Sequence, residues 1–410
     1  MTRGLSDGKI VPIKRPGEGL AGAKRLYALD ALRGLAALAV VVWHWQHFYA
    51  LDGLWPHAWH PQAQPFFAVL KPLYTQGLVA VDLFFALSGF VFFWLYSDAI
   101  AQNRMSARKF AKLRFSRLFP LHFVVLVAVT LMQLAFWNLT ERQFVYQEND
   151  GLHFLLNLFL VQQWTPLTGG LSFNGPAWSI SVEVLLYAIF FGFMRVGLNR
   201  LWHLMFVIAL GVTIFNFNNP VASGLIGFFM GGVAFRATKA IAKRADAPKN
   251  ARLLCAAAIL AWVLVAIETY VGPFDAELYA FAASFNDPLA RKFATDILLL
   301  AFLLIVCPLT LMALALHEKV LGASYKRFSF LGDISYAVYM LHFPLQLALA
   351  LLAVRYGFSS AVFNSGWVML AFFFGLNGLA ALSYRHFEKP LQDLLRGRVH
   401  KTTPQMRAAA

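Results

Sequence analysis

The sequence predicts an all-α membrane protein that crosses the bilayer about ten times. Its 410 residues are 59% hydrophobic and only 13% charged, with a mean hydropathy of +0.60, whereas a water-soluble domain carries about 25% charged residues. Apolar stretches of about 17 to 25 residues recur along the chain, and each can span roughly 30 Å of hydrocarbon. Lysines and arginines gather in every second connection between these stretches. Together, these observations exclude an ordinary soluble domain.

The limits of the apolar runs set the expected spans. In chain order these are residues 30–50, 77–97, 119–137, 178–196, 201–216, 220–237, 252–271, 295–316, 329–354 and 364–386. The predicted organisation is a basic tail over 1–26, one transmembrane domain over 27–395 and a second tail over 396–410. The first tail lacks the apolar core of a cleavable signal peptide, so it is expected to remain on the protein.

Positive charge predicts the orientation of the spans. The densest basic clusters lie at residues 104–117 and 236–252, and both fall in the same alternating set of connections. Because cytoplasmic loops are enriched in Lys and Arg, we expect both termini in the cytoplasm. The net charge of +15 is then explained by loops that face anionic lipid, and nucleic-acid binding is not required.

Residues 152–164 are apolar but number only about a dozen, and Gly169, Gly170 and an Asn-Gly-Pro turn follow them. If this stretch were a full span, every later helix would be inverted and the basic cluster at 236–252 would lie outside. A stretch this short is more typical of a re-entrant or interfacial segment. We therefore predict about ten spans and one such segment.

The first span carries an arginine and a histidine on one helix face. His44 lies eleven positions after Arg33, which is about three turns and about 16 Å of helix. Ionisable side chains inside a membrane are costly and usually serve a function. A lone arginine can extend to the membrane surface, but this does not explain a histidine on the same face.

Two carboxylates are expected at the depth of His44. Asp82 and Glu183 each lie about five residues into a span that descends from the outer surface, or roughly 7 Å deep. The structural alternative remains open for both, because a buried carboxylate can simply bond a neighbouring helix.

Other polar side chains recur at helical spacing: Ser179, Glu183 and Tyr187 in one span, and Ser335, Tyr339 and His342 in another. The structural alternative is favoured for Tyr339 and His342, since Tyr and His often form hydrogen bonds between helices. Trp178 is more typical of an interfacial anchor. Ser88 lacks the Gly-x-Ser-x-Gly context of a nucleophile, and the adjacent Gly89 favours close packing.

These motifs resemble the integral-membrane acyltransferase-3 family, over about residues 27–395. They are Arg33-x10-His44, Val81 to Phe90, Arg114-x-x-Arg117 before Pro120, Trp178-Ser-x-Ser181-x-Glu183, Leu331 to His342 and Ser383 to Pro390. Each motif is weak alone, but six in order are specific. Because the chain ends about twenty residues after Pro390, no fused SGNH hydrolase-like domain is expected.

The resemblance implies O-acyl transfer, with acetyl as the expected group, from cytoplasmic acyl-CoA to a hydroxyl of a surface or exported glycan or glycolipid. The implied location is a bacterial inner membrane, and the implied partners are the bilayer, acyl-CoA and a carbohydrate acceptor. The expected catalytic residues are His44, Arg33, Glu183 and Asp82; the expected donor-binding residues are Arg33, Arg108, Arg114 and Arg117; Ser88, Trp178, Ser181, Tyr187, Tyr339 and His342 are candidate supporting residues. No metal is expected.

In this interpretation His44 is the general base on the acceptor hydroxyl, since imidazole titrates near neutrality. Glu183 or Asp82 would orient its ring, and the sequence does not decide between them. Guanidinium groups suit the phosphates of CoA because they bind phosphate with two parallel hydrogen bonds.

Two other functions fit part of the pattern. A secondary transporter of a small polar or anionic solute also has buried charges and a re-entrant segment. A lipid-linked glycosyltransferase would more naturally carry an acidic pair and a large outer loop, and the outer loops here are short. The acceptor, the acyl chain length and the oligomeric state are left open.

Overall fold

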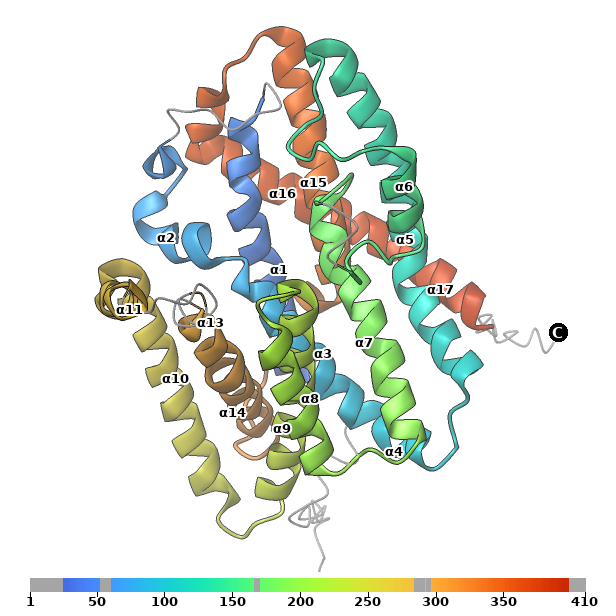
Figure 1. Ribbon diagram of the computed structural model, residues 1–410, viewed down its shortest axis with the longest axis vertical. Helices are drawn as coiled ribbons and strands as arrows, with labels where there is room; N and C mark the ends of the chain where they lie inside the picture. The colour runs from blue at the N-terminus through green and yellow to red at the C-terminus, as the bar shows by residue number, and fades with distance from the viewer. Residues whose placement is uncertain (1–24, 52–59, 166–169, 284–291, 293–295, 398–410) are drawn as a thin grey trace, which may run out of the picture.

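The computed structural model describes residues 25–51, 60–165, 170–283, 292 and 296–397, and every regular element among them is helical (Figure 1). The longer helices are α1 (Tyr27–Trp43), α2 (Phe67–Gln76), α3 (Val79–Leu95), α5 (Ala107–Thr140), α7 (Trp178–Arg195), α8 (Leu201–Ile214), α9 (Asn219–Ile241), α10 (Ala247–Val271), α11 (Pro273–Ala283), α14 (Cys307–Lys319), α15 (Ser329–Tyr356) and α16 (Gly366–Ser383). Shorter helices are α4 (Ser97–Ala101), α6 (Gly151–Leu158), α13 (Ile297–Ala301) and α17 (Lys389–Arg396). The predicted all-α class is confirmed. Most of the two predicted tails lies outside the described residues.

Eight helical segments in the described part of the chain are long and apolar enough to cross a membrane. They cover Tyr27–Tyr49, Ala107–Thr140, Gly175–Arg195, Asn219–Ile241, Ala247–Val271, Ile297–Lys319, Lys326–Tyr356 and Gly366–Arg396. Helices α2 and α3 add a ninth if taken together, although they are bent by 62° at the break between them. Helix α8 has 14 residues, about 21 Å, which is less than the roughly 30 Å hydrocarbon core. Every predicted span has a helix, and the polytopic architecture is confirmed.

Helices α3 and α9 pack with their backbones in contact. A Cβ atom added at Gly89 of α3 would lie 1.8 Å from the carbonyl oxygen of Phe228, and one added at Gly231 of α9 would lie 1.9 Å from that of Ala86. No real side chain fits at such distances, so glycine is required for this approach, as is common where membrane helices pack. This contact fixes which face of α3 can turn toward the functional site.

Helices α1 and α15 run in the same direction and touch near their starts. A Cβ at Gly34 would lie 2.3 Å from the Cβ of Leu331. His44 comes ten residues after Gly34, and His342 comes eleven residues after Leu331. At 1.5 Å per residue, both histidines therefore reach the same level, about 15 Å beyond the contact.

The apolar stretch predicted to be re-entrant or interfacial forms the eight-residue helix α6 followed by turns. The Oδ1 atom of Asp150 accepts a hydrogen bond from the backbone N–H of His153 and caps the helix. Beyond α6, the Trp164 side chain donates to the carbonyl oxygen of Ser181 on α7 over 2.9 Å. The stretch is thus held against α7, and α6 is too short to cross the membrane.

Candidate active site

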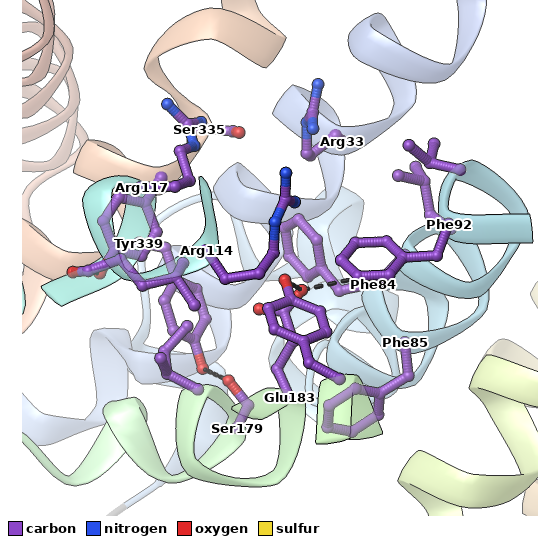
Figure 2. Close-up of a pocket in the computed structure, with 17 residues that line it drawn as sticks. Arg33, Phe84, Phe85, Phe92, Arg114, Arg117, Ser179, Glu183, Ser335 and Tyr339 are labelled. Atoms are coloured by element: carbon purple, nitrogen blue, oxygen red, sulfur yellow. Dashed lines mark hydrogen bonds between the residues drawn. The ribbon is translucent and has the colours of Figure 1, made fainter. Parts of the chain in front are cut away.

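A cavity of about 150 Å³ lies between α1, α3, α5, α7 and α15. Its polar lining residues are Arg33, Ser88, Arg114, Arg117, Ser179, Glu183, Tyr187, Ser335, Tyr336 and Tyr339. Figure 2 shows the three arginines on one side of the cavity and Ser179 on the opposite side. Residues from five helices, far apart in sequence, therefore meet around one polar space. Seven of the predicted site residues are among them.

The guanidinium groups in this cavity have spare hydrogen-bond donors. Arg33 is paired with Asp30, one helical turn earlier. Arg114 donates from Nη2 to the hydroxyl of Tyr96 over 2.7 Å, and its guanidinium lies 5.0 Å from the ring centre of Phe92. The Nε atoms of Arg33 and Arg114 are buried and have no hydrogen-bond partner within the described residues. Buried polar groups rarely lack a hydrogen-bond partner. The unpartnered N–H groups of the two arginines are suited to an anion with several oxygens.

Glu183 supplies a carboxylate to the cavity from α7. Its Oε1 atom accepts hydrogen bonds from Ser88 Oγ on α3 (2.9 Å) and from Tyr187 OH one turn along α7 (2.5 Å). The i,i+4 spacing predicted from the sequence accounts for the second bond. The carboxylate thus ties α3 to α7 beside the arginines, as the dashed lines in Figure 2 show.

Tyr339 belongs both to the cavity and to a group of histidines beyond it. Its hydroxyl lies 2.7 Å from Ser179 Oγ and donates to the carbonyl oxygen of Pro176 over 2.5 Å. Its ring centre lies 5.8 Å from that of His342. His44 and His342 do not line the cavity, and Tyr339 is the described contact that joins them to it.

His44 and His342 form a buried pair. Helix α1 ends at Trp43, and His44 begins a 3-10 helix that continues to Tyr49. His44 Nδ1 lies 2.9 Å from the carbonyl oxygen of Val40 and 3.2 Å from His342 Nε2, while His342 Nδ1 lies 2.6 Å from the carbonyl oxygen of Tyr339. Both rings are almost fully buried.

These contacts determine the tautomers of the neutral rings. A carbonyl oxygen only accepts, so Nδ1 carries the proton in both His44 and His342. His342 Nε2 can then accept from His44 Nδ1, and His44 Nε2 is left as the basic atom. No hydrogen bond involves His44 Nε2 in the described part of the chain. The pair thus offers one free basic nitrogen.

Besides His44 and His342, four predicted residues lie away from the cavity. Asp82 is buried on α3 but does not line it, and the ring of Trp178 packs against Phe85, with ring centres 6.1 Å apart. Ser181 Oγ accepts the backbone N–H of Gln163 and so anchors the segment after α6. Arg108 is exposed in the first turn of α5. Neither Asp82 nor Glu183 is a hydrogen-bond partner of His44 among the described contacts.

Sequence reasoning missed the residues that hold the arginines. Asp30 pairs with Arg33, and Glu388 lies 3.9 Å from Arg117. The i,i+3 spacing of Asp30 and Arg33 is a signal that could have been used. The pairing of Glu388 with Arg117 on α5 follows only from the packing of distant segments, although Glu388 lies in one of the six motifs.

Within the described residues, one group of side chains could hold a metal ion. Glu148, Asp150 and His153 offer ligand atoms within 4.8 Å of one another. Asp150 already caps α6, and the backbone N–H of His153 lowers the pKa of this carboxyl. This local role accounts for the geometry without a metal, and exposed acidic groups of this kind are common.

Comparison with known proteins gives a family and two relatives. A family model described as "Acyltransferase domain" matches residues 26–385. Acyltransferase MdmB of Streptomyces mycarofaciens is 34% identical over 189 residues, which are 43% of this chain and 42% of that protein. Protein 2 in picA locus of Rhizobium radiobacter is 29% identical over 180 residues, 41% of this chain and 81% of that protein. The chain thus matches less than half the length of the first relative, and no solved structure matches.

Proposed function

Because the chain belongs to the acyltransferase-3 family of membrane acyltransferases, we propose that it moves an acyl group from acyl-CoA to a hydroxyl of a surface or exported glycan or glycolipid. Acetyl is the expected group. The observation that carries this proposal is the cavity with three arginines, two of which have buried N–H groups without partners. A donor that brings phosphate oxygens would satisfy these groups.

We propose a bacterial inner membrane as the location, with both termini in the cytoplasm. The alternation of basic connections supports this orientation. In it, α5 begins on the cytoplasmic side, so Arg114 and Arg117 face entering CoA, and the pantetheine arm extends toward His44. The rise along the helix from Arg33 to His44, about 16 Å, is comparable to the length of that arm. Tyr339, which contacts both Ser179 of the cavity and His342, lies on this route.

His44 supplies the base in the proposed reaction. Its Nε2 atom accepts the proton of the acceptor hydroxyl while the hydroxyl oxygen bonds to the thioester carbonyl carbon. The carbon–sulfur bond then breaks, and the departing CoA thiolate takes the proton from the imidazolium. His342 Nε2 faces the Nδ1–H of His44 at 3.2 Å and thereby orients the ring and stabilises its charged form, as a carboxylate does in other triads.

Membrane vesicles of known orientation test the proposed reaction. Radiolabelled acetyl-CoA is supplied to everted inner-membrane vesicles that contain the protein, and to right-side-out vesicles as a control. We expect label to enter glycan or glycolipid only in the everted vesicles, with one CoA released for each acyl group transferred. Ion-coupled movement of a solute without CoA release would instead identify a secondary transporter and overturn the proposal.

Glu183→Gln tests the role of the cavity carboxylate. The substitution keeps the size of the side chain but weakens the hydrogen bonds from Ser88 and Tyr187. Hydrogen bonds to charged groups contribute about 1.5 to 3 kcal/mol, so the single-turnover rate is expected to fall about 10- to 100-fold. Glu141→Gln, at the exposed end of α5, is the matched control. An unchanged rate would limit Glu183 to a structural role.

A further inference from the structure

The segment that follows α16 packs against α5, the helix that carries Arg114 and Arg117. After Ser383, residues Tyr384–Glu388 form a π-helical turn, and α17 continues from Lys389 to Arg396. Figure 1 shows this last helix beside α5. Single π-helical turns are rare and are frequent at functional sites. The proposed general base and the proposed donor-binding residues all come from other helices. The reaction proposed above therefore gives this segment no role.

Glu388 is the buried acidic residue of this turn. It is 3% exposed, and its Oε2 atom lies 3.9 Å from Arg117 Nη1. Ser383 Oγ donates to Oε1 over 3.5 Å, and Oε2 has no hydrogen bond within the described residues. Taking a carboxylate out of water is costly unless a cation compensates it, and Arg117 is the cation that faces it.

Arg117 is held from two sides. Its guanidinium lies 5.6 Å from the ring centre of Tyr336 on α15, a cation–π contact. The Glu388 carboxylate lies at Nη1. Arg117 also lines the cavity, so the carboxylate and the ring limit the directions in which the rest of its N–H groups can point.

The far end of α17 holds the same turn of α5. Arg396 donates from Nε to Ser116 Oγ over 2.9 Å and from Nη2 to the carbonyl oxygen of Leu113 over 3.3 Å. Both ends of α17 therefore contact residues 113–117, the turn that presents the two α5 arginines to the cavity.

We infer that Glu388 is a positioning residue that orients Arg117 toward the donor phosphates, and that α17 clamps the α5 turn on which Arg117 sits. This inference rests on the proposed acyl-CoA donor. A carboxylate behind a guanidinium restrains its orientation, as outer partners do for metal ligands. Because Glu388 acts through Arg117, it affects donor binding and leaves the proton transfer at His44 unchanged.

Equilibrium binding of CoA to the full-length protein in nanodiscs tests the inference, with calorimetry as the readout. Glu388→Gln is expected to raise the Kd for CoA about tenfold. This is the lower end of the loss of affinity that follows mutation of the outer partners of metal ligands. In the transfer assay KM for acyl-CoA rises by the same factor, while kcat stays at the wild-type value. Combining Glu388→Gln with Arg117→Ala should add nothing to Arg117→Ala alone, because both changes remove the same interaction.

Asp393→Asn is the matched control, since Asp393 lies on α17 and pairs with Lys389 on the same helix. It should leave the Kd unchanged. If Glu388→Gln cannot be purified folded, Arg396→Ala removes the clamp at the other end of α17 and has the same expected split between KM and kcat. An unchanged Kd in Glu388→Gln beside a raised Kd in Arg117→Ala would overturn the positioning role alone. No CoA binding by the wild-type protein would overturn the proposed donor and this inference with it.

Discussion

Replacing His44 with alanine is expected to lower kcat about 10²- to 10⁴-fold, the usual contribution of a general base. The ring is held through Nδ1 by Val40 and His342, and alanine removes the one free basic nitrogen of the pair. The arginine cavity should be unaffected because His44 is not among its lining residues. KM for acyl-CoA is therefore expected to stay near the wild-type value, and single-turnover loss of acyl-CoA measures the chemical step directly.

The His44→Ala protein should remain folded. Gln346 donates to the backbone carbonyl oxygen of His44 over 2.8 Å, and this bond does not depend on the side chain. His203→Ala is the control, since the His203 ring contacts that of Trp202 on α8, with ring centres 3.6 Å apart, and is not part of the cavity. Thermal unfolding in detergent separates loss of fold from loss of chemistry. Full activity in folded His44→Ala would contradict the assignment of the base.

Much of the fold could be predicted from hydropathy alone, because a membrane-spanning helix must be long, apolar and satisfied in its own backbone hydrogen bonds. The short stretch before α7 shows that length matters as much as composition. This stretch forms the eight-residue helix α6. A full span had been excluded there because it would have placed the basic cluster at 236–252 outside. Helix α8, with 14 residues, shows the limit of the same reasoning, since hydropathy predicts a span there without fixing its length.

The candidate site was harder to predict, because the depth of a residue in the membrane does not say toward which neighbouring helix its side chain points. Asp82 was expected beside His44 since both lie at a similar depth. Asp82 and Ser88 are six residues apart on α3, which places them about 120° apart around the helix. Ser88 lines the cavity and Asp82 does not. The rotation of α3 is set by its packing on α9 through Gly89, and this contact cannot be read from α3 alone.

Pairs between distant segments were the least predictable. His342 was expected as a supporting residue, but its place beside His44 depends on the contact between Gly34 and Leu331. Once that contact is known, equal spacing along two parallel helices predicts the pair. No such spacing rule predicts the contact between Glu388 and Arg117, because a π-helical turn separates Glu388 from the regular part of α16.

Replacing Arg114 and Arg117 together with alanine is expected to raise KM for acyl-CoA about 10²-fold or more, with a much smaller effect on KM for the acceptor. A hydrogen bond to a charged group contributes about 1.5 to 3 kcal/mol, and a guanidinium can make two to one phosphate. Arg114 has a buried Nε atom without a partner among the described residues, so it has capacity for such bonds. Initial rates at varied acyl-CoA and fixed acceptor give the two constants.

A general attraction of positive charge for anionic CoA predicts a different result. In that case Lys112→Ala, an exposed change on the same helix, would raise KM by a similar factor, and high salt would erase the difference between variants. Specific binding predicts that Lys112→Ala is silent. It also predicts an intermediate KM when both arginines become lysine, because the charge is kept and the planar fork is lost. A rise in acceptor KM with unchanged donor KM would instead make the arginine cavity the acceptor site, and the direction of transfer along α1 would be reversed.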